Sequence, residues 1–191
     1  MTTSNVRPEP NDHNGDEAAL VVDLTCDWLE RAVIGLNLCP FARAVHARKQ
    51  IRWVVSAVST EADLLEVLAE ELKLLDATDP TQVETTLLIH PAVLTDFLDY
   101  NRFLKKADRL LERANLQGVL QIASFHPDYC FAGAERQAMS NYSNRSPYPL
   151  LHLLRESAVE QAVRSHPDTA QIFLRNIETL ERLGAEGWSR L

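Results

Sequence analysis

Two apolar runs that each end in His-Pro decide the fold: TTLLIHP at residues 85–91 and VLQIASFHP at residues 119–127. Short β-branched apolar runs are typical of buried strands, and proline cannot continue a strand ladder, so we predict strands over 85–89 and 119–125. Between them, apolar residues recur every three or four positions, which predicts an amphipathic helix capped near Gly118. The residues on this stripe are Phe97, Tyr100, Leu104, Ala107, Leu111 and Ala114.

The same alternation of strand and helix extends toward the N-terminus. Residues 51–58 have a strand pattern, and Thr60 with Asp63 predicts the cap of a helix that runs to about Asp76. Residues 20–33 repeat at helical spacing, and Gly35 is expected to end that first helix. Residues 1–15 are polar and rich in Pro and Asn, which predicts a disordered tail.

Toward the C-terminus, segment 149–154 is short and apolar, so periodicity alone cannot decide between a strand and a helical turn. Helices are predicted over 157–164 and 170–183, with Gly184 ending the second. This order predicts a single α/β domain over residues 16–191, with a small, mostly parallel sheet flanked by helices and a helical N-terminal element. The alternative is an α+β fold with an antiparallel fourth strand at 149–154.

Composition narrows the class of protein. The 191 residues carry a formal net charge of −8, which argues against binding the nucleic-acid backbone. The three cysteines have no regular spacing, so a disulfide framework is not expected. No signal-peptide pattern and no run of about 18 apolar residues occurs, so we expect a cytoplasmic protein with no membrane partner.

The two His-Pro motifs place candidate chemistry at one edge of the sheet. If the two strands run parallel, His90 and His126 lie together at their C-terminal ends, with Asp128 close by. Histidine paired with Asp suits acid–base catalysis, and the same three side chains are possible ligands of a divalent metal. The plainer interpretation is that each histidine only caps the end of its strand.

The polar loop after residue 126 contains the candidate substrate-binding groups. Arg145 could clamp a carboxylate or phosphate, with a structural role in the loop as the equally weighted alternative. His152, among apolar neighbours, fits a core histidine better than a site residue. The other predicted binding residues are Asn141, Tyr142, Asn144, Ser146 and Arg155.

Cys39-Pro40-Phe41 resembles the redox turn of glutaredoxin-like folds, but it follows a helix and has no second cysteine three residues on. A buried, unreactive Cys39 is therefore the default, and a nucleophilic Cys39 activated by nearby basic residues is the alternative. Gly-rich phosphate loops and serine-hydrolase motifs are absent from the sequence.

Several motifs together resemble the bacterial DUF1415 family, a domain of unknown function, over residues 18–188. The resemblance implies a single-domain cytoplasmic bacterial protein, and it carries no reaction or catalytic residue with it. The motifs are WLE (28–30), GLNLCPFA (35–42), FLDYN (97–101), QIASFHPD (121–128), NRSPYP (144–149) and LHLLRE (151–156).

The leading functional hypothesis is a hydrolase or group transferase acting on a small, polar, anionic metabolite. His126 and Asp128 would act as the acid–base pair, and Arg145 with Asn144 as the anion clamp. One alternative is a metal-binding or redox protein using Cys39, His90, His126 and Asp128. The other is a non-catalytic module whose aromatic loop docks on a partner.

Overall fold

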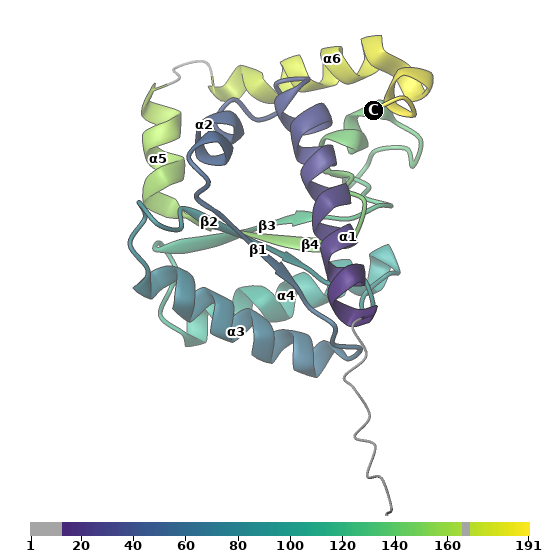
Figure 1. Cartoon of the computed structure of the whole chain (residues 1–191). Helices are drawn as coiled ribbons and strands as arrows, with labels where there is room; N and C mark the ends of the chain where they lie inside the picture. The colour runs from purple at the N-terminus through teal and green to yellow at the C-terminus, as the bar shows by residue number, and fades with distance from the viewer. Residues whose placement is uncertain (1–12, 166–168) are drawn as a thin grey trace, which may run out of the picture.

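The computed structural model describes residues 13–165 and 169–191. Residues 1–12 of the predicted tail lie outside this part, and α1 begins at His13, so the predicted tail was too long at its C-terminal end. Among the described residues, no helix has the length and apolar character needed to cross a bilayer. The elements, shown in Figure 1, are α1 (His13–Trp28), the π-helix η1 (Leu29–Ile34), α2 (Ala42–Ala47), β1 (Ile51–Val55), α3 (Glu61–Ala77), β2 (Thr85–Ile89), α4 (Phe97–Arg113), β3 (Leu120–Phe125), the 3₁₀-helix η2 (Met139–Asn144), β4 (Leu150–Arg155), α5 (Glu156–Ser165) and α6 (Thr169–Trp188).

The four strands form one sheet in the order β1-β2-β4-β3. β1 pairs with β2 in parallel, whereas β4 lies between β2 and β3 and pairs antiparallel with both. The α/β class and the helical N-terminal element are confirmed, and so is the antiparallel fourth strand of the alternative. The prediction of a mostly parallel sheet was wrong, because no crossover helix of ordinary length separates β3 from β4. The chain therefore begins β4 on the same side of the sheet at which β3 ends, and β4 runs antiparallel to β3.

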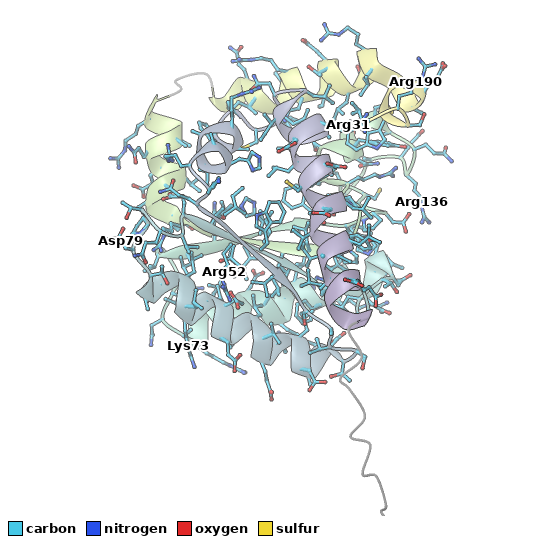
Figure 2. The ribbon with its side chains drawn as sticks, in the orientation of Figure 1. Arg31, Arg52, Lys73, Asp79, Arg136 and Arg190 are labelled. Atoms are coloured by element: carbon cyan, nitrogen blue, oxygen red, sulfur yellow. The ribbon has the colours of Figure 1, made fainter. Side chains whose placement is uncertain are left out.

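Helices α3 and α4 cover one face of the sheet, as Figure 1 shows. Leu88, Leu151 and Leu153 point into this layer and are fully buried against Tyr100 and Phe103 of α4. Arg52 of β1 also points to this side, where its guanidinium pairs with the Glu71 carboxylate of α3 at 2.7 Å (Figure 2). This layer forms the larger hydrophobic core of the protein.

The opposite face of the sheet lies beneath α1, α2 and α5 (Figure 1). Leu87, Ile89 and Leu150 pack there against Val21 of α1. By contrast, α2 contributes no buried residue. The packing on this face is therefore tight beneath α1 and open beneath the shorter helices.

Local sequence signals mark the boundaries of several helices. The Thr60 hydroxyl accepts a hydrogen bond from the Asp63 backbone N–H and caps α3. α4 ends at Arg113 with Ala114 as its C-cap, and the next residue, Asn115 (φ 56°), adopts the left-handed conformation. The prediction of a cap near Gly118 (φ 74°) was therefore wrong, whereas Gly184 (φ 66°) breaks α6. Gly35 closes η1, where a Cβ atom would collide with the Arg31 carbonyl oxygen, so the tight end of the π-helix requires glycine.

Candidate functional site

His90 and His126 lie at the same edge of the sheet, as the sequence predicts. Ile89 and Phe125 both pair with Leu150 of β4, so the two histidines that follow them emerge at the same level. The Tyr100 ring lies against both, with centroid distances of 5.8 Å to His90 and 5.1 Å to His126. Both histidines are fully buried.

Both ring nitrogens of His126 are hydrogen bonded to the backbone. Nε2 donates to the Leu94 carbonyl at 3.2 Å, and Nδ1 accepts from the Asp128 backbone N–H at 3.0 Å. Burial lowers the pKa of His126 below its usual value, so the ring is neutral at neutral pH. The main chain of Asp128 thus fixes the His126 tautomer that carries its proton on Nε2, and the Asp128 carboxylate plays no part in this.

His90 is fixed in the opposite tautomer. Its Nδ1 donates to the Val93 carbonyl at 2.9 Å, and its buried Nε2 has no hydrogen-bond partner among the described residues. Burial lowers the pKa of His90 to about 4. An uncharged ring avoids the large cost of burying a cation without a counter-charge.

The charged groups of the loop after β3 bond to the loop itself. The exposed Asp128 carboxylate pairs with Arg136 at 3.3 Å. Arg145 donates from Nε to the Tyr129 carbonyl and from a terminal nitrogen to the Arg136 carbonyl at 2.6 Å, and its guanidinium lies 4.2 Å from the Tyr142 ring centre. These contacts match the structural role weighed for Arg145.

The polar residues of the same loop also have partners within it. Asn141 is fully buried, where its amide accepts from the Phe131 N–H and donates to the Glu135 carbonyl. Asn144 donates to the Ser124 carbonyl at 3.1 Å, and the Ser146 hydroxyl donates to the Tyr148 carbonyl. These side chains shape the loop and anchor it to β3.

Arg155 lies away from the other predicted residues. It pairs with Leu120 at the start of β3, whereas His126 follows the other end of that strand. Its guanidinium is buried and donates to the carbonyls of Leu75, Thr78 and Val83, which ties β4 to the end of α3 and the segment after it.

A cavity of about 630 Å³ lies between the sheet and helices α1, α2 and α5. Its floor is the sheet face that points away from α3 and α4, with Leu87, Gln121, Ala123 and His152 near its centre. Several residues that line this volume have small side chains that do not fill it. They are Ala123 in β3, Ala42 and Ala44 in α2, and Ala158 and Ala162 in α5. Pockets that bind small molecules typically have about 300–1,000 Å³ and mostly apolar walls.

His152 stands in the middle of the cavity floor. It pairs with Leu87 of β2 on one side and Ala123 of β3 on the other, and its ring faces Phe125 at 6.2 Å. Burial alone lowers its pKa to about 4, and neither ring nitrogen bonds to a described residue. The neutral ring therefore offers one hydrogen-bond donor and one acceptor to the cavity.

Cys39 and Trp28 also line the cavity. Cys39 also lines an adjoining hollow of about 470 Å³ together with Asn144, and the two hollows share Val33, Cys39 and Phe125. The indole N–H of Trp28 is buried without a hydrogen-bond partner among the described residues. Of the predicted site residues, only Cys39 contributes to the larger cavity.

The side chains placed closely enough to hold a metal ion differ from the predicted ligands. In the described part of the chain, the only group of three His, Cys, Asp or Glu side chains with potential ligand atoms within 4.8 Å of one another is Cys26, Glu30 and His46. His90, His126 and Asp128 do not form such a group.

Sequence reasoning missed His152 as the centre of a site. The strict alternation of Leu151, His152 and Leu153 places the histidine on the face opposite the leucines, and that signal was visible. The space around His152 was not, because it depends on how far α2 and α5 stand from the sheet.

Comparison with known proteins gives one finding. A family model described as "Protein of unknown function (DUF1415)" matches residues 20–190. Comparisons with curated proteins and with solved structures found no match. The match covers nearly the whole chain, and the chain therefore belongs to the DUF1415 family.

Proposed function

We propose that this protein binds a small molecule with a largely apolar body and one hydrogen-bonding group, in the cavity between the sheet and α1, α2 and α5. The observation that carries the proposal is His152, a neutral histidine without a hydrogen bond to a described residue, on the floor of a cavity of about 630 Å³. His152 is half-buried, and a ligand that displaces water from its ring leaves the ring nitrogens unsatisfied unless the ligand itself forms a hydrogen bond to them. A bound ligand group would provide that partner.

The apolar walls select the ligand body. Leu29, Val33, Ile51, Leu87 and Leu154 line the cavity, and burying the ligand against them contributes about 25 cal/mol per Å² of apolar surface. His152 and Gln121 provide the polar contacts that orient it. Arg48 and Glu84 also line the cavity and carry opposite charges, so the lining does not select a strongly charged ligand.

The hydrolase or transferase reaction of an anionic metabolite stays a prediction, and it needs changes in the observed contacts. His126 would have to release Leu94 or the Asp128 N–H to exchange a proton with a substrate. Arg145 would have to leave the carbonyls of Tyr129 and Arg136 to bind an anion. The cavity around His152 needs no such rearrangement, so the geometry favours it.

The docking-module alternative receives less support. An exposed aromatic loop would favour it, but the aromatic rings of this loop pack against neighbouring rings. Tyr129 lies 5.3 Å from Phe97 and 5.0 Å from Phe131, and Tyr142 lies 5.1 Å from Trp188, measured between ring centroids.

The test uses N-phenyl-1-naphthylamine, a neutral apolar dye with one N–H group, titrated into the full-length protein. We expect saturable fluorescence enhancement with one equivalent bound. Ala123→Phe fills the cavity floor and should weaken binding at least about tenfold, while Val119→Phe adds bulk at an exposed position and should leave it unchanged. Circular dichroism verifies that both variants fold. Equal binding by wild type and Ala123→Phe, or no saturable binding, would contradict the proposal.

A second variant separates the polar contact from apolar burial. His152→Leu replaces the hydrogen-bonding ring with an apolar side chain. We expect it to weaken displacement of the dye by 1-octanol about three- to tenfold and to leave displacement by octane unchanged, as loss of one hydrogen bond implies. Parallel losses for octanol and octane would show that His152 only shapes the cavity.

A further inference from the structure

Cys26, Glu30 and His46 form a cluster outside both hollows, where the N-terminal helix meets α2. Cys26 lies in the last two turns of α1, Glu30 in η1 and His46 in the last turn of α2. Cys26 and Glu30 are four residues apart, so one helical face presents both side chains. His46 reaches them from a separate element, and its Nε2 lies 2.8 Å from the Glu30 carboxylate.

The distances within the cluster are close to those of a coordination sphere. The Cys26 sulfur lies 4.0 Å from Oε1 of Glu30, the same oxygen that His46 contacts. Tetrahedral Zn²⁺ with ordinary bond lengths requires about 3.6 Å between sulfur and oxygen and about 3.4 Å between nitrogen and oxygen. The sulfur–oxygen and nitrogen–oxygen distances each need a shift of about half an ångström, and all three ligand atoms already lie within 4.8 Å of one another. The Glu30 and His46 side chains are 53% and 28% exposed, so they have room to move.

The charge around Cys26 favours a cation. The Cys26 thiol lies near three carboxylates, those of Glu30, Asp27 and Asp23. Reactive cysteines sit instead near positive charge, which stabilises the thiolate. Negative charge around a thiol, next to a histidine and a carboxylate, suits a divalent metal ion, which supplies the missing positive charge.

We propose that Cys26, Glu30 and His46 bind one Zn²⁺ ion through Sγ, one carboxylate oxygen and Nε2, with water at the fourth position. Zinc accepts this mixture of sulfur, oxygen and nitrogen ligands. On binding, the thiol proton of Cys26 passes to solvent, and the His46 ring carries its remaining proton on Nδ1. The ion would join α1 and η1 to α2, which otherwise contributes no buried residue.

The first experiment is a Co²⁺ titration of untagged full-length protein that has been stripped with chelator. Tetrahedral Co²⁺ bound to a thiolate gives visible ligand-field bands and a near-ultraviolet sulfur-to-cobalt band. We expect both with one equivalent, and we expect Zn²⁺ to displace the cobalt. Cys26→Ser should abolish the sulfur band and weaken Zn²⁺ binding by at least about 100-fold, and His46→Gln should weaken it comparably.

Cys130→Ser is the matched control, because Cys130 contacts the Phe131 and Ala134 carbonyls in a different loop. It should retain both the cobalt spectrum and the Zn²⁺ affinity of wild type. Persistence of the sulfur band in Cys26→Ser, or its absence in wild type, would overturn the assignment. Alkylation mapped by mass spectrometry adds a readout on the unmutated protein: Zn²⁺ should protect Cys26 from iodoacetamide and leave Cys130 unprotected.

Discussion

Burial holds His90, His126 and His152 in the neutral form, by lowering the pKa of each. The three histidines differ in how many of their ring nitrogens have a hydrogen-bond partner. His126 has partners on both nitrogens, His90 has a partner on Nδ1 alone, and His152 has none among the described residues. His126 is thus held by the backbone on both sides, whereas His152 faces the cavity described above.

The low pKa of His90 makes the stability of the protein depend on pH. Its folded-state pKa of about 4 lies below the unfolded value of 6.5, so its stabilisation is full above pH 6.5 and is lost as pH falls toward 4. Linkage gives a loss of about 2 kcal/mol at about pH 5. His90→Asn keeps a donor for the Val93 carbonyl and cannot titrate.

Urea unfolding of wild type and His90→Asn near pH 7.5 and near pH 5 tests this linkage. We expect wild type to lose about 2 kcal/mol more than the variant over that interval. The contributions of His126 and His152 are present in both proteins and cancel in the comparison. Equal losses in the two proteins would show that His90 does not titrate with a lowered pKa.

Tyr100 shows how one helix secures the end of two strands. Its hydroxyl donates to the Leu150 carbonyl at 2.8 Å and accepts from the Phe125 N–H at 3.1 Å. Phe125, the last residue of β3, pairs with Leu150, the first residue of β4, so the α4 side chain closes the ladder just before His126. Burial raises the pKa of Tyr100, which keeps the hydroxyl proton available to donate.

Tyr100→Phe should lower the free energy of unfolding by about 1–3 kcal/mol, because it leaves a backbone carbonyl and an N–H without their partner. The matched control is Tyr148→Phe, since the Tyr148 hydroxyl has no hydrogen bond to a described residue. That control should change stability by less than about 0.5 kcal/mol. Hydrogen exchange at the Phe125 amide should also quicken in Tyr100→Phe. Similar stability in both variants would mean that the two bonds contribute little.

The elements that the sequence predicted well are those whose signals are local. The strand at 85–89 and the Thr60 cap of α3 follow from neighbouring residues, and both are confirmed. The position of β4 between β2 and β3 is a non-local outcome, because it depends on where a long loop returns the chain. Arg155 illustrates the same limit: its motif says nothing of the carbonyls of α3 that it binds.

The candidate site also combines features that local sequence signals predict with features that depend on the packing of distant segments. Strand endings placed His90 and His126 at one edge, which is confirmed. The cavity around His152 could not be predicted, because it results from the small side chains of three separate elements and the spacing between them. The many polar side chains in the loop after β3 predict ligand binding, but Asn141, Asn144 and Arg145 donate hydrogen bonds to backbone carbonyls of the loop and of β3.

At the scale of the whole molecule, the C-terminal helix α6 connects segments that are distant in sequence. The Asn176 amide donates to the Leu38 carbonyl at 2.9 Å, and Arg31 of η1 donates to the Arg190 carbonyl at 2.7 Å, where Figure 2 shows the two arginines close together. Trp188 packs on Tyr142 of η2. These contacts join the C-terminal segment to η1, to the segment after η1 and to η2. We therefore expect α6 to unfold together with the sheet.

We therefore expect one cooperative unfolding transition, which is the behaviour of the predicted single domain over residues 16–191. A variant with Trp28→Phe and Trp53→Phe leaves Trp188 as the sole tryptophan reporter, and far-ultraviolet circular dichroism follows the remaining structure in the same sample. We expect the urea midpoints of fluorescence and dichroism to coincide, with Trp188→Phe following the fluorescence of the other two tryptophans as a control. If Trp188 fluorescence changed at lower urea while most of the dichroism remained, α6 would be a separately unfolding unit. The hydrogen bonds to Leu38 and Arg190 would then be too weak to couple it to the sheet.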